Sequence, residues 1–146
     1  MRSFRKNAKV VLLVVAAVLI ICQFIRIDKT NPPVLSDIPT DSSVKSILKQ
    51  SCYDCHSNET KWPWYSNVAP VSWLLSNDVN GARKHLNFSE WGSYNPEKQL
   101  SKLDDIRDQI RQGDMPLWYY SLMHPSARIK QNEREKILSW TAGSKQ

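Results

Sequence analysis

The stretch that decides the fold is Cys52-Tyr53-Asp54-Cys55-His56, which follows the pattern C-x-x-C-H. This pattern is the attachment signal of c-type haem: two thiols add to the vinyl groups of the porphyrin, and the adjoining imidazole faces the iron. One turn of helix brings Cys52 and Cys55 to the same side and carries His56 beneath the ring. The stretch therefore predicts one covalently held haem c, attached at both cysteines, with His56 as an iron ligand.

Three other interpretations of the two cysteines compete with haem attachment. A thioredoxin-like dithiol would lie near a βαβ pattern, and no alternating strand pattern follows His56. A structural zinc site would need two more ligands at partner spacing, whereas the third cysteine, Cys22, lies inside an apolar run. A disulfide between Cys52 and Cys55 in an exported chain stays open at this point.

An apolar segment at residues 10–25, interrupted by Gln23, follows a basic N-terminus that contains Arg2, Arg5, Lys6 and Lys9. A positive tip before an apolar run is typical of an export signal. The run is shorter than the ~20 residues that cross a bilayer, but Arg26 can extend its reach by snorkelling. Because bulky side chains at residues 19–23 stand where a signal peptidase needs small ones, we predict an uncleaved transmembrane signal anchor.

The distribution of charge predicts the orientation of the chain and excludes one class of partner. A basic N-terminus stays in the cytoplasm, which places the C-terminal body on the periplasmic side of a bacterial cytoplasmic membrane. The net charge is +6, but six of the twenty Lys and Arg residues, and only one of the fourteen acidic residues, precede Asn31. The body is therefore close to neutral and has no basic aromatic patch, which excludes nucleic-acid binding.

The sequence pattern predicts three segments and an all-α fold. Residues 1–29 are the basic tip and transmembrane anchor, residues 30–40 a proline-containing linker, and residues 41–146 a small cytochrome c-like helical domain around one haem. Helical periodicity and end signals predict four helices in this domain. The first begins at Asp41–Ser43 and leads into Cys52, and the second runs from Pro70 toward His85. The third runs from Asn95-Pro96 to Gly113, and the fourth from about Gln131 to Thr141, before Gly143.

The second axial position of the iron decides between electron transfer and chemistry on a small molecule. The side chains that could reach it are Met115, Met123, His85 and His124. Met115 is favoured because it follows the helix stop Gly113 in a turn stiffened by proline, which can present a long side chain to a buried metal. A thioether ligand favours ferrous iron. Met123 and His124 stay open as ligands, whereas His85 is expected to be a favourable charge at a helix C-terminus.

Aromatic residues gather in two proline-bounded loops, and we expect some of them to form a haem pocket. The candidates are Trp62, Trp64 and Tyr65 in the first loop, and Trp118, Tyr120, Met123 and His124 in the second. These side chains would keep water from the porphyrin, although ordinary core packing explains the aromatic rings equally well. A backbone carbonyl of the proline-containing loop after His56 is expected to accept the proton of His56 Nδ1.

Several strings after the linker are individually uncommon. They are Cys52-Tyr53-Asp54-Cys55-His56-Ser57-Asn58, Trp62-Pro63-Trp64-Tyr65, Ala69-Pro70-Val71-Ser72-Trp73-Leu74, His85-Leu86-Asn87-Phe88-Ser89-Glu90-Trp91, Met115-Pro116 and His124-Pro125. In these strings the chain resembles the bacterial haem-binding domain family of c-type-cytochrome-like proteins. The resemblance implies covalent haem at Cys52 and Cys55 with His56 as proximal ligand. The chain departs from the family at Ile129-Lys130, where a Leu-Ser helix cap is expected.

These observations favour a membrane-anchored monohaem c-type cytochrome that transfers single electrons outside the cytoplasmic membrane. Its partners would be redox proteins or a terminal oxidase or reductase at the membrane. The alternative is a haem-based sensor or peroxidase-like enzyme with an open or displaceable sixth iron position. A third possibility is a structural domain in which C-x-x-C forms a disulfide. No nucleophile–base pair or carboxylate dyad argues for catalysis, so an electron carrier is favoured over an enzyme.

Overall fold

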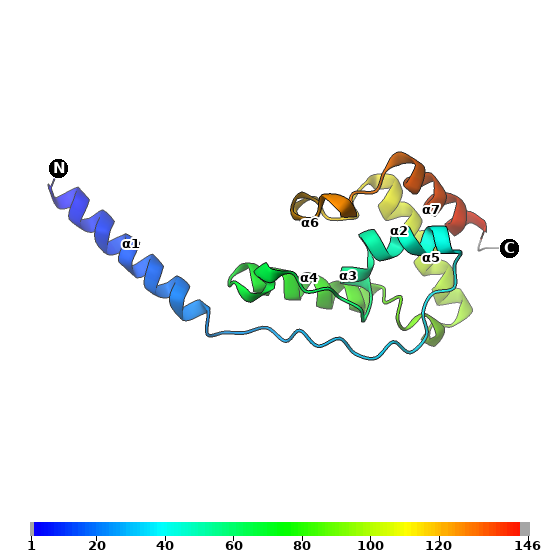
Figure 1. Ribbon diagram of the computed structural model, residues 1–146, viewed down its shortest axis with the longest axis horizontal. Coiled ribbons are helices and arrows are strands. Elements are labelled where there is room, and N and C mark those ends of the chain that lie inside the picture. The colour runs from blue at the N-terminus through cyan, green and yellow to red at the C-terminus, as the bar shows by residue number, and fades with distance from the viewer. Residues whose placement is uncertain (1, 144–146) are drawn as a thin grey trace. The chain divides into compact units, whose positions relative to one another are not determined.

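A computed structural model describes residues 2–143, with side chains from residue 7 onward, and its regular elements are all helices. The helices are α1 (Arg2–Cys22), α2 (Ser42–Ser51), α3 (Tyr53–His56), α4 (Val71–His85), α5 (Pro96–Gln112), α6 (Trp118–Met123) and α7 (Gln131–Gly143) (Figure 1). Short 3-10 helices lie at η1 (Trp64–Asn67), η2 (Trp91–Ser93) and η3 (Pro125–Ala127). The prediction of a small all-α domain is confirmed.

By their contacts, the residues group into two compact units. The first contains the chain up to residue 30 together with residues 62–78, and the second contains residues 31–61 together with residue 79 onward. The C-x-x-C-H stretch and Met115 both belong to the second unit.

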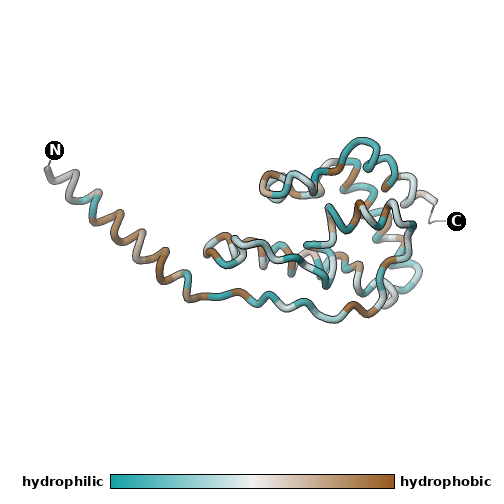
Figure 2. Tube along the Cα trace, in the orientation of Figure 1, coloured by the Kyte–Doolittle hydropathy of each residue, from teal (hydrophilic) through white to brown (hydrophobic). Residues whose placement is uncertain are grey.

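Helix α1 carries the apolar run of the first unit. Figure 2 shows its hydrophobic character, and the side chains from Val10 to Ile21 that are large and apolar are exposed. Among the residues that the structure describes, no helix is both long enough and apolar enough to cross a membrane. The predicted transmembrane helix is therefore not found.

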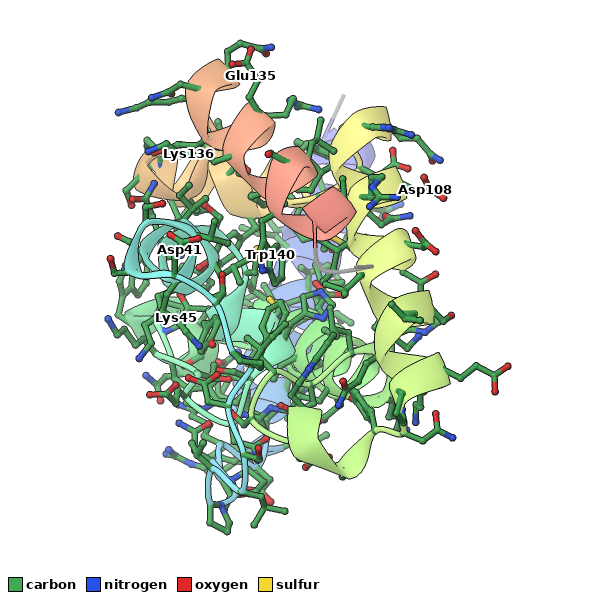
Figure 3. All side chains as sticks on the ribbon, turned by 90° about the vertical axis from the view of Figure 1, so that its right-hand side faces the viewer. Asp41, Lys45, Asp108, Glu135, Lys136 and Trp140 are labelled. Carbon is green, nitrogen blue, oxygen red and sulfur yellow. The ribbon has the colours of Figure 1, made fainter. Side chains whose placement is uncertain are left out.

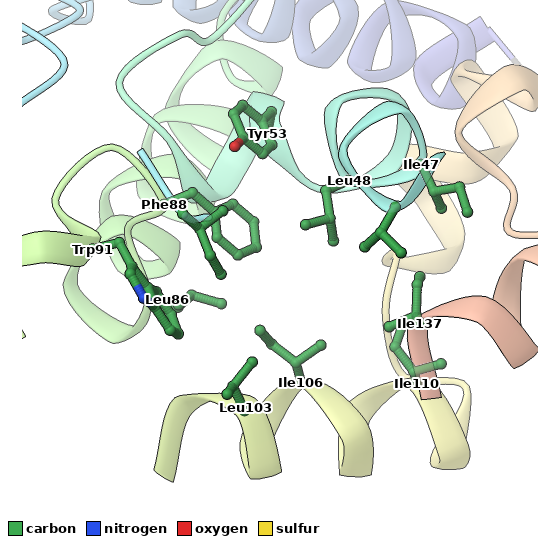
Figure 4. Packing of buried hydrophobic residues seen from close by; sticks show 12 residues of the cluster. Ile47, Leu48, Tyr53, Leu86, Phe88, Trp91, Leu103, Ile106, Ile110 and Ile137 are labelled. Atoms are coloured by element: carbon green, nitrogen blue, oxygen red, sulfur yellow. The ribbon is translucent and has the colours of Figure 1, made fainter. Parts of the chain in front are cut away.

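The core of the second unit is an apolar cluster built from helices far apart in the sequence. Figure 4 shows side chains from α2, α5, α7 and the stretch after α4 pointing toward a common space. The cluster consists of Ile38, Val44, Ile47, Leu48, Tyr53, Leu86, Phe88, Trp91, Leu103, Ile106, Ile110 and Ile137. Trp140 packs against the cluster, while the charged side chains of Asp108, Glu135 and Lys136 project outward (Figure 3). The inward face of α5 follows the helical spacing of its apolar residues.

Local end signals fix the helices that surround this core. The Asp41 carboxylate accepts hydrogen bonds from the backbone N–H groups of Ser43 and Val44 at 2.8 and 3.1 Å. The Asn95 side chain accepts from Lys98 N at 2.8 Å, and Gly113 ends α5 with a φ of 79°. The predicted starts of these two helices and the predicted stop of α5 are confirmed.

One additional helix and one helix start differ from what the sequence predicted. Residues 118–123 form α6 rather than an aromatic loop. Helix α7 begins where the family's expected Leu-Ser cap is replaced, and the Glu133 side chain accepts a hydrogen bond from Lys130 N at 2.8 Å instead. This bond is one half of a capping box, so the backbone of Lys130 is capped without a serine.

The stretch before α2 is extended, and it packs on the second unit. Leu35 N and Ser36 N donate to the Ser89 carbonyl at 2.9 and 3.1 Å, and Trp91 N donates to the Ser36 carbonyl at 2.9 Å. Ile38 is 2 % exposed and belongs to the core. A Cβ added at Gly92 would meet Ser36 Oγ at 2.5 Å, so this contact requires glycine. Residues 35–38 are thus part of the fold around the core.

Candidate functional site

The C-x-x-C-H stretch forms a tight helical turn at the end of α2. Cys55 N and His56 N both donate to the Cys52 carbonyl, at 3.1 and 2.9 Å. Cys52 ends α2 and precedes α3, so this turn brings both thiols and the imidazole onto one short segment. No disulfide joins Cys52 and Cys55, and burial, with the charge of Cys55 added, raises the pKa of the Cys52 thiol to about 12. Residues 52–56 thus carry two sulfur atoms and an imidazole within one turn.

A cavity of about 550 Å³ lies beside this turn, within the second unit. Cys52, His56 and Met115 all line it, and so does His85. The apolar lining residues are Leu48, Leu86, Phe88, Ile106, Ile110 and Ile137, and α5 adds Lys102, Asp105, Asp108, Gln109 and Gln112. A volume of roughly 300–1,000 Å³ with mostly apolar walls and a few polar groups is typical of cofactor sites.

One ring nitrogen of His56 is already engaged. Nδ1 lies 3.1 Å from the Leu86 carbonyl, and because a carbonyl can only accept, Nδ1 carries the proton in this pair. The neutral ring then presents the lone pair of Nε2. Burial lowers the pKa of His56, which favours the neutral form. The expected backbone acceptor is present, but its predicted position in the proline-containing loop is wrong, because Leu86 follows α4.

The segment that carries Leu86 is fastened to the segment that carries His56. Phe88 N donates to the His56 carbonyl at 2.8 Å, and the Asn87 amide donates to Asn58 Oδ1 at 2.9 Å. Ser89 N donates to Asn87 Oδ1 at 3.1 Å, and Asn58 N donates to Ser89 Oγ at 2.9 Å. Asn58, Asn87 and Ser89 are all buried. These bonds hold the Leu86 carbonyl in place behind the imidazole.

Arg83, near the end of α4, adds further bonds to the residues that follow His56. Its guanidinium donates to the Ser57 carbonyl at 2.8 Å and to Thr60 Oγ1 at 2.8 Å. A third bond of 2.7 Å reaches Asn31 Oδ1. Residues 57–60 are therefore tied to α4 as well as to the stretch after it.

Tyr53, inside the C-x-x-C-H stretch, is held from both sides. Its ring stacks on Phe88 with centroids 5.1 Å apart, and its hydroxyl donates to Asp37 Oδ1 at 2.5 Å. Lys45 Nζ donates to Asp37 Oδ2 at 2.8 Å. Burial raises the pKa of Asp37, but the hydrogen bonds from Lys45 and Tyr53 outweigh it and leave the pKa lowered. The turn is thus anchored to the extended stretch before α2.

Met115 reaches the cavity from a different kind of segment. It follows Gly113 and Asp114, both exposed, and is itself half-buried. The carbonyl of Ile110, near the end of α5, accepts a hydrogen bond from Arg134 on α7. Gly113 N and Asp114 N donate to the Gln109 carbonyl at 3.0 and 3.2 Å, but in the described part of the chain no hydrogen bond reaches Met115 or Pro116. Met115 therefore lies beside the same space as Cys52 and His56 on a lightly held loop.

The other candidate ligands divide between the cavity and the surface. His85 is exposed at the end of α4, lines the cavity and immediately precedes Leu86, whose carbonyl bonds His56 Nδ1. Met123 is exposed, and His124 stacks on Tyr120 with ring centroids 4.5 Å apart. Neither Met123 nor His124 lines the cavity. The structure brings Met115, rather than these two, to the side of Cys52 and His56.

The predicted aromatic pocket residues do not line the cavity. Trp62, Trp64 and Tyr65 belong to the first unit, where the indole N–H of Trp62 is buried without a hydrogen-bond partner. Trp118 is exposed on α6. Tyr120 is linked to the C-x-x-C-H stretch, because its hydroxyl donates to Asp54 Oδ2 at 2.6 Å. Tyr120 therefore contacts the turn through Asp54 and does not line the cavity.

Sequence reasoning missed the role of residues 86–89. Their signal was visible as apolar Leu86 and Phe88 alternating with Asn87 and Ser89, which are polar but uncharged. Such side chains can be buried when they are hydrogen-bonded to one another. The contact with His56, thirty residues away, is tertiary and has no local signature.

The donor set and the cavity together fit an all-α haem-binding protein: the thiol of Cys52, the imidazole of His56 and the thioether of Met115 border one apolar space. Cys55 does not line the cavity and lies on the same helical turn as Cys52 and His56. The family described as the haem-binding domain matches residues 17–143. The chain belongs to this haem-binding domain family, and haem is its cofactor. Comparison with curated proteins found no match, and comparison with solved structures found none either.

Proposed function

We propose that the chain is a monohaem c-type cytochrome in which haem is attached covalently to Cys52 and Cys55. The observation that carries this proposal is the shared cavity wall of Cys52, His56 and Met115, with His56 Nδ1 already bonded to Leu86. When bound, the haem supplies an iron centre that takes up and releases one electron. The established family accounts for haem, and the spacing of the thiols supports covalent attachment.

The residues of the chain hold and insulate such a centre. His56 would present Nε2 to the iron, while the Leu86 carbonyl keeps the proton on Nδ1 and fixes the plane of the ring. Leu48, Phe88 and Ile106 line the cavity with apolar side chains and would keep water from the haem. Met115 would supply a soft thioether as the sixth ligand, which stabilises ferrous iron and raises the reduction potential.

A haem-based sensor or peroxidase-like enzyme is the second candidate, and the loop of Met115 favours it. Gly113 and Asp114 are exposed, and Met115 is only half-buried. A ligand on a lightly held loop can be displaced by a small molecule such as CO, NO or peroxide. The two functions share the haem and differ in whether Met115 stays on the iron.

The test uses the full chain made in a host that attaches haem to cytochromes c. We expect haem to stay with the polypeptide on a denaturing gel, to be lost in the C52S/C55S double variant and to be kept in the control C22S. Colourless wild-type protein with the mass of the bare polypeptide would contradict the proposal.

The sixth ligand is tested by the spectrum of the same haem-loaded protein. We expect a low-spin, six-coordinate ferrous form and a ferric methionine band that disappears in Met115→Ala. The matched control Met123→Ala changes an exposed methionine and keeps the band. A five-coordinate ferrous form that binds CO at once would favour the sensor or enzyme.

We propose in addition that the chain is attached to a bacterial cytoplasmic membrane through residues 10–25, with the haem domain on the periplasmic side. The exposed apolar side chains along α1 and the basic residues before them support attachment. Partners would then be redox proteins, or an oxidase or reductase, in the same membrane, where tethering raises the local concentration. Flotation of the full chain with lipid vesicles tests this attachment.

A further inference from the structure

The first unit carries a second surface, which the haem cavity does not use. Trp64, Val68, Val71 and Leu74 are exposed apolar side chains spaced three or four residues apart across η1 and the start of α4. We call these four residues the interfacial patch. Ser66, Ala69 and Ser72, which lie between them, and Leu75, which follows them, are buried, so the apolar exposure is one-sided. Trp64 is 74 % exposed, and an exposed cluster of this kind marks a binding surface.

Hydrogen bonds fasten the patch segment to the end of the apolar run. The side-chain amide of Gln23 pairs with both backbone groups of Ala69: Nε2 donates to the carbonyl at 3.1 Å, and Oε1 accepts from N at 3.0 Å. Trp73 Nε1 donates to the Ile25 carbonyl at 3.1 Å. Lys29 Nζ donates to Asn67 Oδ1. These three links join residues 23–29 to residues 67–73 within one unit.

The same bonds account for the one polar residue in the apolar run. Gln23 would cost free energy in an apolar environment, but its amide is paired with Ala69 and with the Leu19 carbonyl at 2.7 Å. Phe24 and Ile25 beside it are exposed, and the next four residues contain the cations Arg26 and Lys29 and the anion Asp28, a net charge of +1. The sequence therefore changes from apolar to basic at the level where the patch is attached.

We propose that the interfacial patch rests in the headgroup layer of the lipid bilayer that holds α1. This inference rests on the proposed membrane attachment. Because Gln23 and Ile25 fix the patch segment at the end of the apolar run, the patch lies where hydrocarbon gives way to headgroups. Trp64 suits that layer, since an indole combines an apolar ring with a polar N–H. Arg26 and Lys29 complement anionic lipid phosphates at the same level.

The experiment places the full haem-loaded chain in phosphatidylcholine vesicles, with and without phosphatidylglycerol, and compares brominated with unbrominated lipid. Bromine near the headgroups quenches the fluorescence of indoles that lie within contact distance. We expect brominated lipid to quench the fluorescence of the wild type, and to quench it more when phosphatidylglycerol is present. In Trp64→Phe the quenching should fall by the part that the Trp64 indole contributes. The matched control Trp118→Phe changes an equally exposed indole of the second unit and keeps the quenching.

The possible results separate the patch from the attachment it rests on. Equal quenching in wild type and Trp64→Phe, on a chain that still floats with the vesicles, overturns the patch and leaves the attachment intact. Failure of the chain to float overturns both. A third result is that Trp64→Phe loses the quenching and the wild type also forms a dimer in the vesicles that depends on Trp64. This result would assign the patch to a second copy of this chain and would also overturn the proposal. The haem spectrum, recorded on the same samples, reports the c-type site independently.

Discussion

His56 and Met115 line the same cavity, but the chain holds them in different ways. On the His56 side, buried Asn58, Asn87 and Phe88 bond or stack around the turn. On the Met115 side, the preceding residues are exposed, and α6, which follows, has no buried residue. A segment opens locally most easily where it makes few apolar contacts and few buried hydrogen bonds. The comparison predicts a rigid His56 side and a Met115 side that opens readily.

This difference matters for function because electron transfer needs a fixed ligand, whereas binding of a small molecule needs a ligand that can move. A fixed imidazole keeps the electronic environment of the iron constant, as single-electron transfer needs. A thioether on a loop that opens would admit a small ligand. The rigidity of the Met115 side therefore separates the two candidate functions, and substitutions on each side test the comparison.

The largest expected effect comes from Phe88→Ala on the rigid side. Phe88 is 1 % exposed, stacks on Tyr53 and has its ring centroid 6.3 Å from that of His56. Truncation of a buried Phe to Ala costs about 3–5 kcal/mol, so we expect a loss of this size in the free energy of unfolding. Urea denaturation of the haem-loaded protein measures it. The control Leu122→Ala, at an exposed residue of α6, is expected to change stability by no more than about 0.5 kcal/mol. Equal losses in the two variants would contradict the comparison.

The next effect comes from Asn87→Ala, which removes the link to Asn58 and the acceptor of Ser89 N. Each buried group left unpaired costs about 1–3 kcal/mol, so we expect a loss of about 2–4 kcal/mol. The Leu86 carbonyl would then bond His56 less firmly, which makes the imidazole a weaker donor and raises the reduction potential. Redox titration and urea denaturation measure the two effects.

The control for this substitution is Asn132→Ala, at an exposed residue of α7. It should move neither the reduction potential nor the stability by a measurable amount. A stability loss in Asn87→Ala with an unchanged potential would show that the bonds brace the fold without positioning His56.

The contrast between the two sides also shows what the sequence could predict. Asp41, Asn95 and Gly113 act on neighbouring backbone groups, so the ends of α2 and α5 could be predicted from local signals. The turn at residues 52–56 is equally local. Helix α6 was missed because it is short, lies between prolines and buries no residue, which leaves no periodic pattern to detect.

Tertiary contacts were beyond local reasoning. Met115 directly precedes Pro116 and Met123 lies two residues before Pro125, and only the fold brings the first to the cavity and leaves the second exposed. The acceptor for His56 Nδ1 could be predicted as a backbone carbonyl, since such acceptors are common, but its position after α4 depends on how α4 returns to the turn. The haem attachment and axial roles of these residues stay predictions.

On the loosely held side, Gly113→Ala is expected to have a smaller effect. Gly113 has a φ of 79°, where a side chain costs about 1 kcal/mol, and the nearest atom to an added Cβ is Arg134 Nη2 at 3.9 Å. Stability should therefore fall by about 1 kcal/mol, because strain and not a clash is the cause. The same substitution should shift the loop of Met115 and weaken the ferric methionine band. Gly143→Ala, where an added Cβ meets nothing within 4 Å, is the matched control and should leave the band unchanged.

The smallest effect appears only in acid and belongs to the rigid side. The pKa of Asp37 is lowered from its ordinary value of 3.8, because the hydrogen bonds from Lys45 and Tyr53 outweigh burial. A lowered folded-state pKa gives stability that is present above about pH 3.8 and is lost as the pH falls through the folded value. We expect the unfolding free energy of Asp37→Asn to be lower than wild type at neutral pH and to fall less steeply below pH 3.8. Acid titration of stability, with Glu97→Gln at an exposed carboxylate away from the cavity as control, measures this slope. Parallel curves for wild type and Asp37→Asn would show that the anchor of Tyr53 does not depend on the charge of Asp37.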